Sequence, residues 1–170
     1  ILTHEMVHLA VPQLPLHQRW LHEGIATYVE AIARGRAGRV SAVSIWQGWL
    51  GAMAQGQPAA NDRGLDFTPT WGRTYWGGAM FCLLADVHMR RRGNTARGLQ
   101  HALQGVLAAG GDYRVRWPAT RVLATADAAV GGSALSTLYE EMKDRPARVD
   151  LDVLWRELGG TFAGGVRDAE

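Results

Sequence analysis

The chain has 170 residues, of which 47% are hydrophobic, and its formal net charge is +2. A chain of this length can bury most of its apolar surface in one compact domain, and the near balance of charge does not favour a nucleic-acid-binding protein. The single cysteine excludes an internal disulfide and is compatible with a reducing or an extracytoplasmic compartment. The longest apolar run is broken by Asp86 and is too short to span a bilayer.

The first ten residues, I-L-T-H-E-M-V-H-L-A, contain the pattern H-E-x-x-H at His4, Glu5 and His8. On an α-helix, positions i and i+4 share a face, so the two imidazoles can point at one metal ion. Glu5 lies one position further round the helix, where its carboxylate can take a proton from a water activated by zinc. The spacing therefore provides two ligands and a base, although the same residues could also be plain polar surface.

A catalytic zinc site takes three protein ligands, so a third ligand must come from elsewhere in the chain. Metzincins place a Gly three residues and a His six residues after the second histidine, but Val11 and Leu14 hold those positions here. The pattern therefore excludes the metzincin class. Pro12 and Pro15 predict an end to the first helix and a stiff connection to the next one.

The segment 20–32, W-L-H-E-G-I-A-T-Y-V-E-A-I, predicts a second helix that returns antiparallel to the first. Its apolar side chains follow helical spacing and form one stripe: Leu21, Ile25, Tyr28, Val29 and Ile32. Glu23 lies off this stripe and is the candidate third ligand. His22 could also bind zinc, but adjacent residues on a helix point about 100° apart, so one rigid helix should present only one of the two.

The two motifs together, H-E-x-x-H followed by W-L-x-E-G-x-A-x-Y-x-E, resemble the gluzincin branch of the zinc metallopeptidases. They are similar to its aminopeptidases and glycyl aminopeptidases and most of all to the bacterial peptidase MA-like domains, because only the 14 residues from Leu9 to His22 separate the second histidine from Glu23. The resemblance covers residues 1–32. It implies that His4, His8 and Glu23 bind one zinc ion (Zn2+) per chain, that Glu5 is the general base, and that the substrate is a peptide or protein.

A second and weaker match lies further along the chain. Aminopeptidases of this branch have a tyrosine at the start of a later helix, where its hydroxyl stabilises the oxyanion of the tetrahedral intermediate. Tyr75 in T-Y-W-G-G-A-M fits that position, but Gly77 stands in place of the usual lysine. Tyr75 could equally be a half-buried aromatic side chain at a helix start. Both interpretations of Tyr75 remain open at this point.

Three more residues could assist the site. Thr27 and Glu30 share a face with Glu23 and could accept the spare N–H of a ligating imidazole. His22 could contact a ligand or stabilise an oxyanion, but we interpret it more readily as a surface histidine. Cys82 lies in an apolar run and is expected to be a small buried hydrophobe, not a nucleophile. No role is assigned to the remaining histidines: His17, His88 and His101.

The rest of the chain has helical periodicity, and no alternating pattern predicts a strand. A loop is expected over 55–72, where it could form a wall of the cleft just before Tyr75. The basic cluster Arg90–Arg92, followed by Arg97, is interpreted as a solvated helix end. Helices are predicted over 43–53, from Tyr75 to Arg92, over 99–107 and over 151–158. Two further helices are predicted to begin with a first turn at Pro118 and with a cap at Ser133. Gly93-Asn94 is expected to end the helix that begins at Tyr75, and Gly159 the last one.

These patterns predict a mainly α fold, interpreted through the resemblance as the helical catalytic half of a zincin (thermolysin-like) fold. The domain is expected over 1–159, with a flexible tail over 160–170. The chain has no initiator Met and little room before His4, so we interpret it as a fragment. In the family, a β-rich segment upstream, missing here, completes the substrate cleft.

The predicted function is that of a zinc-dependent metallopeptidase. The resemblance favours a bacterial periplasmic or secreted protein, with no nucleic-acid partner and no membrane-spanning segment in this chain. The alternative is a non-catalytic helical interaction domain that keeps a zincin fold. The intact Glu5 favours the enzyme, because a domain without turnover has no need of the base.

Overall fold

The computed structural model describes residues 2–92 and 97–159. Within these ranges the regular elements are all helical, and the one strand-like pairing is an isolated parallel bridge between Gln13 and Arg116. The prediction of a mainly α fold is therefore confirmed for this part of the chain. None of the helices described is long and apolar enough to cross a bilayer. The predicted helix end at Gly93-Asn94 and the predicted tail over 160–170 lie outside the described residues.

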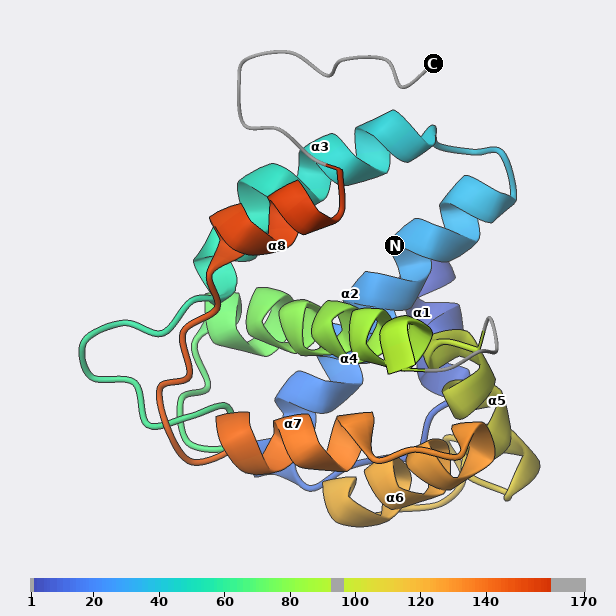
Figure 1. Cartoon of the computed structure of the whole chain (residues 1–170). Coiled ribbons are helices and arrows are strands. Elements are labelled where there is room, and N and C mark those ends of the chain that lie inside the picture. The colour runs from blue at the N-terminus through green and yellow to red at the C-terminus, as the bar shows by residue number, and fades with distance from the viewer. Residues whose placement is uncertain (1, 93–96, 160–170) are drawn as a thin grey trace.

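Two helices cross at the centre of the fold, α2 and α4, and the others pack around them (Figure 1). In Figure 1, α3 and α8 lie together at one end, whereas α5, α6 and α7 lie at the other. The helices are α1 (Leu2–Leu9), α2 (Arg19–Arg36), α3 (Ala42–Ala52), α4 (Gly78–Arg92), α5 (Leu99–Ala108), α6 (Ala119–Val130), α7 (Ala134–Met142) and α8 (Leu151–Glu157). Shorter helical turns are η1 (Leu16–Gln18), η2 (Met53–Gly56) and η3 (Arg73–Gly77).

The backbones of α2 and α4 touch where the two helices cross. A Cβ atom added at Gly24 would overlap the backbone of Gly78, and one added at Gly78 would overlap the carbonyl oxygen of Trp20. Only glycine allows two helices to approach this closely, because every other residue places a carbon in the contact. Gly24 directly follows Glu23, so this close helix contact lies next to the candidate ligand.

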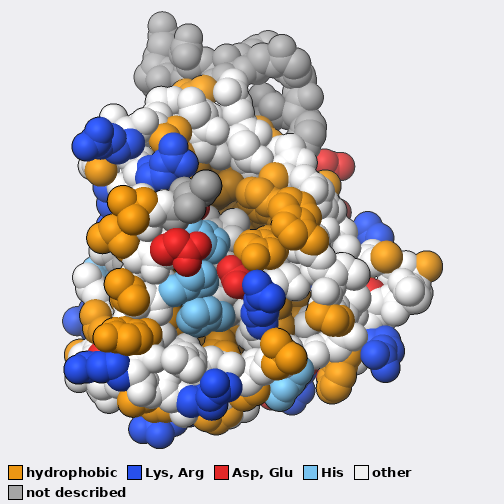
Figure 2. Space-filling model, turned by 180° about the vertical axis from the view of Figure 1, so that it is seen from behind, with side chains coloured by type: hydrophobic (Ala, Val, Ile, Leu, Met, Phe, Trp, Pro, Cys, Tyr) orange, Lys and Arg blue, Asp and Glu red, His pale blue; other side chains and the backbone are white. Residues whose placement is uncertain are grey.

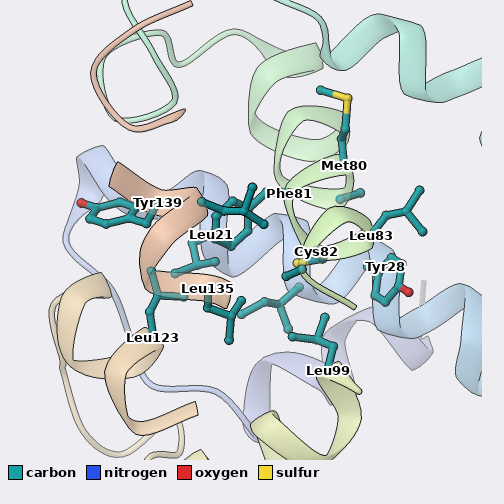
Figure 3. Packing of buried hydrophobic residues seen from close by; sticks show 14 of the residues in the cluster. Leu21, Tyr28, Met80, Phe81, Cys82, Leu83, Leu99, Leu123, Leu135 and Tyr139 are labelled. Atoms are coloured by element: carbon teal, nitrogen blue, oxygen red, sulfur yellow. The ribbon is translucent and has the colours of Figure 1, made fainter. Parts of the chain in front are cut away.

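The apolar stripe of α2 enters the core as the sequence predicts. Leu21, Ile25 and Tyr28 are buried, and the other two members of the stripe are partly buried against the same core. Figure 3 shows Leu21 and Phe81 meeting between α2 and α4, with side chains of α6 and α7 closing the other side. Cys82 is fully buried, as predicted, and burial raises the pKa of its thiol.

A buried polar network fixes the loop between η2 and η3 against the start of α2. The Trp20 indole N–H donates to Asp66 Oδ1 at 2.7 Å, and the Tyr139 hydroxyl donates to Asp66 Oδ2 at 2.7 Å. Gln18 in turn donates from Nε2 to the Tyr139 oxygen at 2.9 Å. Because a buried carboxylate is costly without such partners, these bonds hold the loop and α7 in one arrangement at this corner.

The turn before α4 is a π-helix, η3, and it is held by a buried ion pair. Arg73 Nε lies 2.7 Å from Asp62 Oδ2, and Arg73 Nη1 donates to the carbonyl of Gly56 at 2.7 Å. The sequence predicted one helix beginning near Tyr75, whereas in the structure Tyr75 lies inside the π turn and α4 begins at Gly78. Residues far apart in the chain create this difference, so local periodicity could not predict it.

The other predicted helices are confirmed with small shifts of their ends, and the predicted cap at Ser133 is confirmed in position but not in its bonding. Ser133 occupies the N-cap position of α7, yet its side chain makes no capping bond. Asp127, on α6, accepts instead from the backbone N–H groups of Leu135 and Ser136, at 3.0 and 2.9 Å. A carboxylate with two acceptor oxygens satisfies two N–H groups at the positive end of the helix and replaces the serine hydroxyl there.

The contact between Gly24 and Gly78 gives a stability prediction. Gly24→Ala should lower the free energy of unfolding by at least about 2 kcal/mol, because its methyl group overlaps backbone and a helix must shift to admit it. The matched control is Gly48→Ala on α3, where a Cβ meets nothing within 4 Å. That change should raise stability by up to about 1 kcal/mol through helix propensity. Urea unfolding measures both, and equal effects of the two substitutions would contradict the contact.

Candidate metal centre

The packing of α1 on α2 brings His4, His8 and Glu23 to one point. His4 Nε2 lies 3.2 Å from Glu23 Oε2, and His8 Nε2 lies 3.5 Å from the same oxygen. One potential ligand atom from each of the three residues lies within 4.8 Å of the others. Figure 2 shows a group of histidine side chains at the surface with acidic and basic side chains beside it. The three residues predicted as ligands are thus brought together.

The separations of these atoms suit a small tetrahedral cation. Zinc bonds of about 2.0–2.1 Å place neighbouring ligand atoms about 3.3–3.4 Å apart in a tetrahedron. The two nitrogen–oxygen separations, 3.2 and 3.5 Å, lie on either side of that spacing. Two imidazoles and a carboxylate are also a donor set found in catalytic zinc sites. Two of the three separations therefore match this spacing, and all three atoms lie within 4.8 Å of one another.

The protonation states of His8 and Glu23 suit metal binding as well. Burial lowers the pKa of His8, against the opposing effect of the Glu23 carboxylate, and this favours the neutral imidazole that a metal requires. Burial alone would raise the pKa of Glu23. Hydrogen bonds from His4 and Arg19 outweigh that effect and hold the pKa below its ordinary value. A neutral imidazole beside an ionised carboxylate is the state in which both can donate electron pairs to a cation.

Arg19 orients the Glu23 carboxylate, and the sequence analysis did not identify it. Its Nε donates to Glu23 Oε1 at 3.1 Å, which leaves Oε2 directed at the two histidines. The hydrogen bond to Glu23 raises the pKa of the guanidinium, and Tyr75 adds to the effect. A signal was present in the sequence, because Arg19 and Glu23 are four positions apart and therefore neighbours on one helix face.

The two predicted helper residues on α2 differ in what they contact. Glu30 Oε2 lies 3.5 Å from His4 Nδ1, so the carboxylate stands where it can fix this ring with Nε2 toward Glu23. Glu30 Oε1 also lies 3.7 Å from Arg34 Nη1. In the described part of the chain Thr27 makes no hydrogen bond to His4 or His8. Of these two residues, therefore, only Glu30 lies where it could accept the spare N–H of a ligating histidine.

His22 is not the exposed surface histidine that the sequence analysis favoured. Its ring is half-buried and stacks on that of His8, with centroids 4.2 Å apart and planes 10° from parallel. Its Nε2 is buried without a hydrogen-bond partner among the described residues, and so is Nδ1 of His8. The prediction failed because α1 packs over this part of α2, where the ring of His8 covers that of His22.

Glu5 and Tyr75 lie near different histidines of the cluster. Glu5 is exposed on α1, and its charge acts on the imidazole of His8, so it stands beside the candidate ligands without being one of them. Tyr75 is half-buried in η3, and its ring centroid lies 6.4 Å from that of His4. The structure therefore brings both predicted catalytic residues to the site. Their roles in catalysis remain predictions.

A pocket of about 900 Å³ opens next to this cluster and shares Arg19 and Tyr75 with it. Its far wall is built by the loop between η2 and η3, as the sequence analysis expected for the segment before Tyr75. A smaller hollow of about 250 Å³, which shares Leu16 and Arg19 with the first, reaches His22 and Glu23. The candidate centre thus lies at the junction of two hollows.

No family model, curated protein or solved structure matches this chain. The site is therefore interpreted from its own residues and their geometry.

The burial of His22 predicts a pH dependence of stability in the metal-free protein. Burial lowers the pKa of His22 from 6.5 to about 4, with the neighbouring His8 ring acting in the same direction. Between these values the unfolded chain binds a proton that the folded chain does not, so stability falls as pH drops from 6.5 towards 4. Above pH 6.5 neither state is protonated there, and this contribution is constant.

His22→Phe should keep the ring stacked on His8 and make stability less dependent on pH in this range. The measurement is the free energy of unfolding at about pH 7.5 and about pH 4.5, compared between wild type and variant. His88→Phe is the control, because His88 is exposed on α4. An unchanged pH dependence in His22→Phe would show that the ring is charged in the folded protein.

Proposed function

We propose that this chain is a zinc-dependent metallopeptidase domain in which His4, His8 and Glu23 hold one zinc ion. The observation that carries the proposal is the convergence of both His Nε2 atoms on one oxygen of Glu23, at 3.2 and 3.5 Å. The resemblance of the two motifs to the gluzincin peptidases supports the same conclusion and extends it to the helical half of a zincin fold. The proposed substrate is a peptide or protein.

A bound zinc ion supplies Lewis acidity, which lowers the pKa of a water molecule and polarises a peptide carbonyl. Glu5, exposed beside His8, takes the proton of the attacking water and delivers it to the leaving amine. The hydroxyl of Tyr75 donates a hydrogen bond to the oxyanion that forms at the carbonyl. Each of these groups therefore has one task in the proposed reaction.

Two residues of α2 keep the proposed ligands in position. Arg19 holds Glu23 Oε1, so that only Oε2 faces the histidines. Glu30 faces Nδ1 of His4, and a carboxylate there favours the tautomer with a proton on Nδ1 and a lone pair on Nε2. Because both residues lie on the helix that carries Glu23, the arrangement of all three depends on one rigid element.

Zinc affinity is predicted to separate Glu23 from His22, its neighbour. Glu23→Ala should weaken zinc binding at least about tenfold, and His4→Ala and His8→Ala should abolish stoichiometric binding, because two ligands hold the ion poorly. His22→Ala should leave the affinity nearly unchanged. Calorimetric zinc titration gives these values, with His88→Ala as a control. The opposite ranking of Glu23 and His22 would indicate a three-histidine site and contradict the gluzincin assignment.

Turnover is predicted to depend on Glu5 without a change in metal content. Glu5→Gln should keep one zinc per chain and lower the rate of peptide cleavage by about two orders of magnitude or more, since the amide cannot accept the proton. Tyr75→Phe should also keep zinc and lower the rate by about 10²–10³, the usual loss for one oxyanion donor. Metal analysis and cleavage of a panel of peptides and proteins measure both.

Two results would contradict these assignments. Loss of zinc in Glu5→Gln would indicate that Glu5 is a zinc ligand. Wild-type rates in Tyr75→Phe would indicate that Tyr75 only packs against its neighbours. Zinc-loaded wild-type protein that cleaves nothing in the panel would favour the alternative, a non-catalytic helical interaction domain.

A further inference from the structure

The pocket of about 900 Å³ beside the metal centre has an aromatic wall that the proposed reaction does not use. Phe67, Trp71 and Tyr75 line this wall, and we call the space the aromatic pocket. The rings of Trp71 and Tyr75 lie 5.8 Å apart with their planes inclined by 32°. Tyr75 links the aromatic pocket to the candidate metal centre, because its ring centroid lies 6.4 Å from that of His4.

The apolar side chains of this pocket are exposed to an unusual degree. Trp71 is 60% exposed, Phe67 is 50% exposed, and Leu16, which also lines the pocket, is 84% exposed. Figure 2 shows hydrophobic side chains gathered directly beside the histidine group. Large apolar groups that cluster around a hollow instead of entering the core mark a binding site.

The wall of the pocket is held in place before any ligand binds. The loop that carries Phe67 bonds to α7 and the residue after it, through Leu65 N–H to the Met142 carbonyl and Asp66 N–H to the Lys143 carbonyl, both at 2.9 Å. The buried pair of Asp62 and Arg73 holds both ends of the segment. A preformed apolar surface loses little conformational freedom on binding, so it can select its ligand.

The charges around the pocket favour some side chains over others. Asp66 lines it, but both oxygens of this carboxylate already accept hydrogen bonds from Trp20 and Tyr139. The other fully charged side chains in its lining are Arg19 and Arg63. A lysine or arginine of a ligand would meet like charge here and find no carboxylate oriented toward it.

We propose that the aromatic pocket binds a large apolar side chain, phenylalanine above all, of the peptide substrate next to the bond that is cleaved, and disfavours lysine and arginine there. This inference rests on the proposed peptidase function for its reaction. It adds the class of substrate, because the ring of Trp71 offers an exposed aromatic face on which a second ring can pack.

The first experiment compares cleavage of blocked peptides Ac-Ala-Ala-X-Ala-Ala-NH2, in which X is Phe, Ala or Lys. Zinc-loaded wild-type protein should cleave the Phe peptide with a kcat/KM at least about tenfold above that of the Ala peptide, with the Lys peptide lowest. Trp71→Ala should remove most of the preference for Phe, measured as the ratio of kcat/KM for the Phe peptide to that for the Ala peptide. Leu107→Ala, a similarly exposed apolar site on α5, is the matched control.

The second experiment separates failure of this inference from failure of the peptidase proposal. Zinc-loaded Glu5→Gln protein is titrated with the same three peptides, and binding is measured by calorimetry without any need for cleavage. Tighter binding of the Phe peptide, lost in the double variant with Trp71→Ala, supports the pocket even if no peptide is ever cleaved. Equal binding of the Phe and Ala peptides, or a preference for Phe that survives both Trp71→Ala and Phe67→Ala, overturns it.

Discussion

The close approach of α2 and α4 at Gly24 and Gly78 determines where the candidate ligands lie. The two backbones are in contact there, so α2 cannot slide or rotate on α4 without a clash. Glu23 comes directly before this contact, and Tyr75 lies three residues before Gly78 in the preceding π turn. A second contact, the packing of α1 on α2, brings the two histidines to Glu23. The two helix contacts together relate the parts of the site that come from three separate segments.

The charge of Glu23 depends on a balance between its burial and its hydrogen bonds. Glu23 is 8% exposed, and a carboxylate at this depth needs donors. Arg19 supplies one from its own helix, and the imidazoles face the other oxygen. The buried pair of Asp62 and Arg73 is poor evidence for stability, because desolvation offsets the attraction of the two charges. The pair holds Arg73, the first residue of the π turn in which Tyr75 lies.

The spacing of residues within each helix predicted which side chains meet at the candidate metal centre. Features that depend on contacts between distant segments were not predicted. The i, i+4 histidines and the stripe of α2 follow from helix geometry, and the structure brings His4, His8 and Glu23 together as expected. Arg19 was missed although its spacing from Glu23 was visible. The stacking of His22 under α1 depends on how two helices cross, and no pattern within one helix encodes that crossing. The Asp127 cap and the π turn likewise depend on residues brought together only by folding.

The central claim, that these three residues form one zinc site, is tested most directly by a crystal structure of the zinc-loaded protein with anomalous data collected at the zinc edge. The account predicts one anomalous peak per chain, bonded to Nε2 of His4, Nε2 of His8 and Oε2 of Glu23 at about 2.0–2.2 Å. A peak bonded to His22 in place of Glu23, or no peak within bonding distance of His4 and His8, would contradict it.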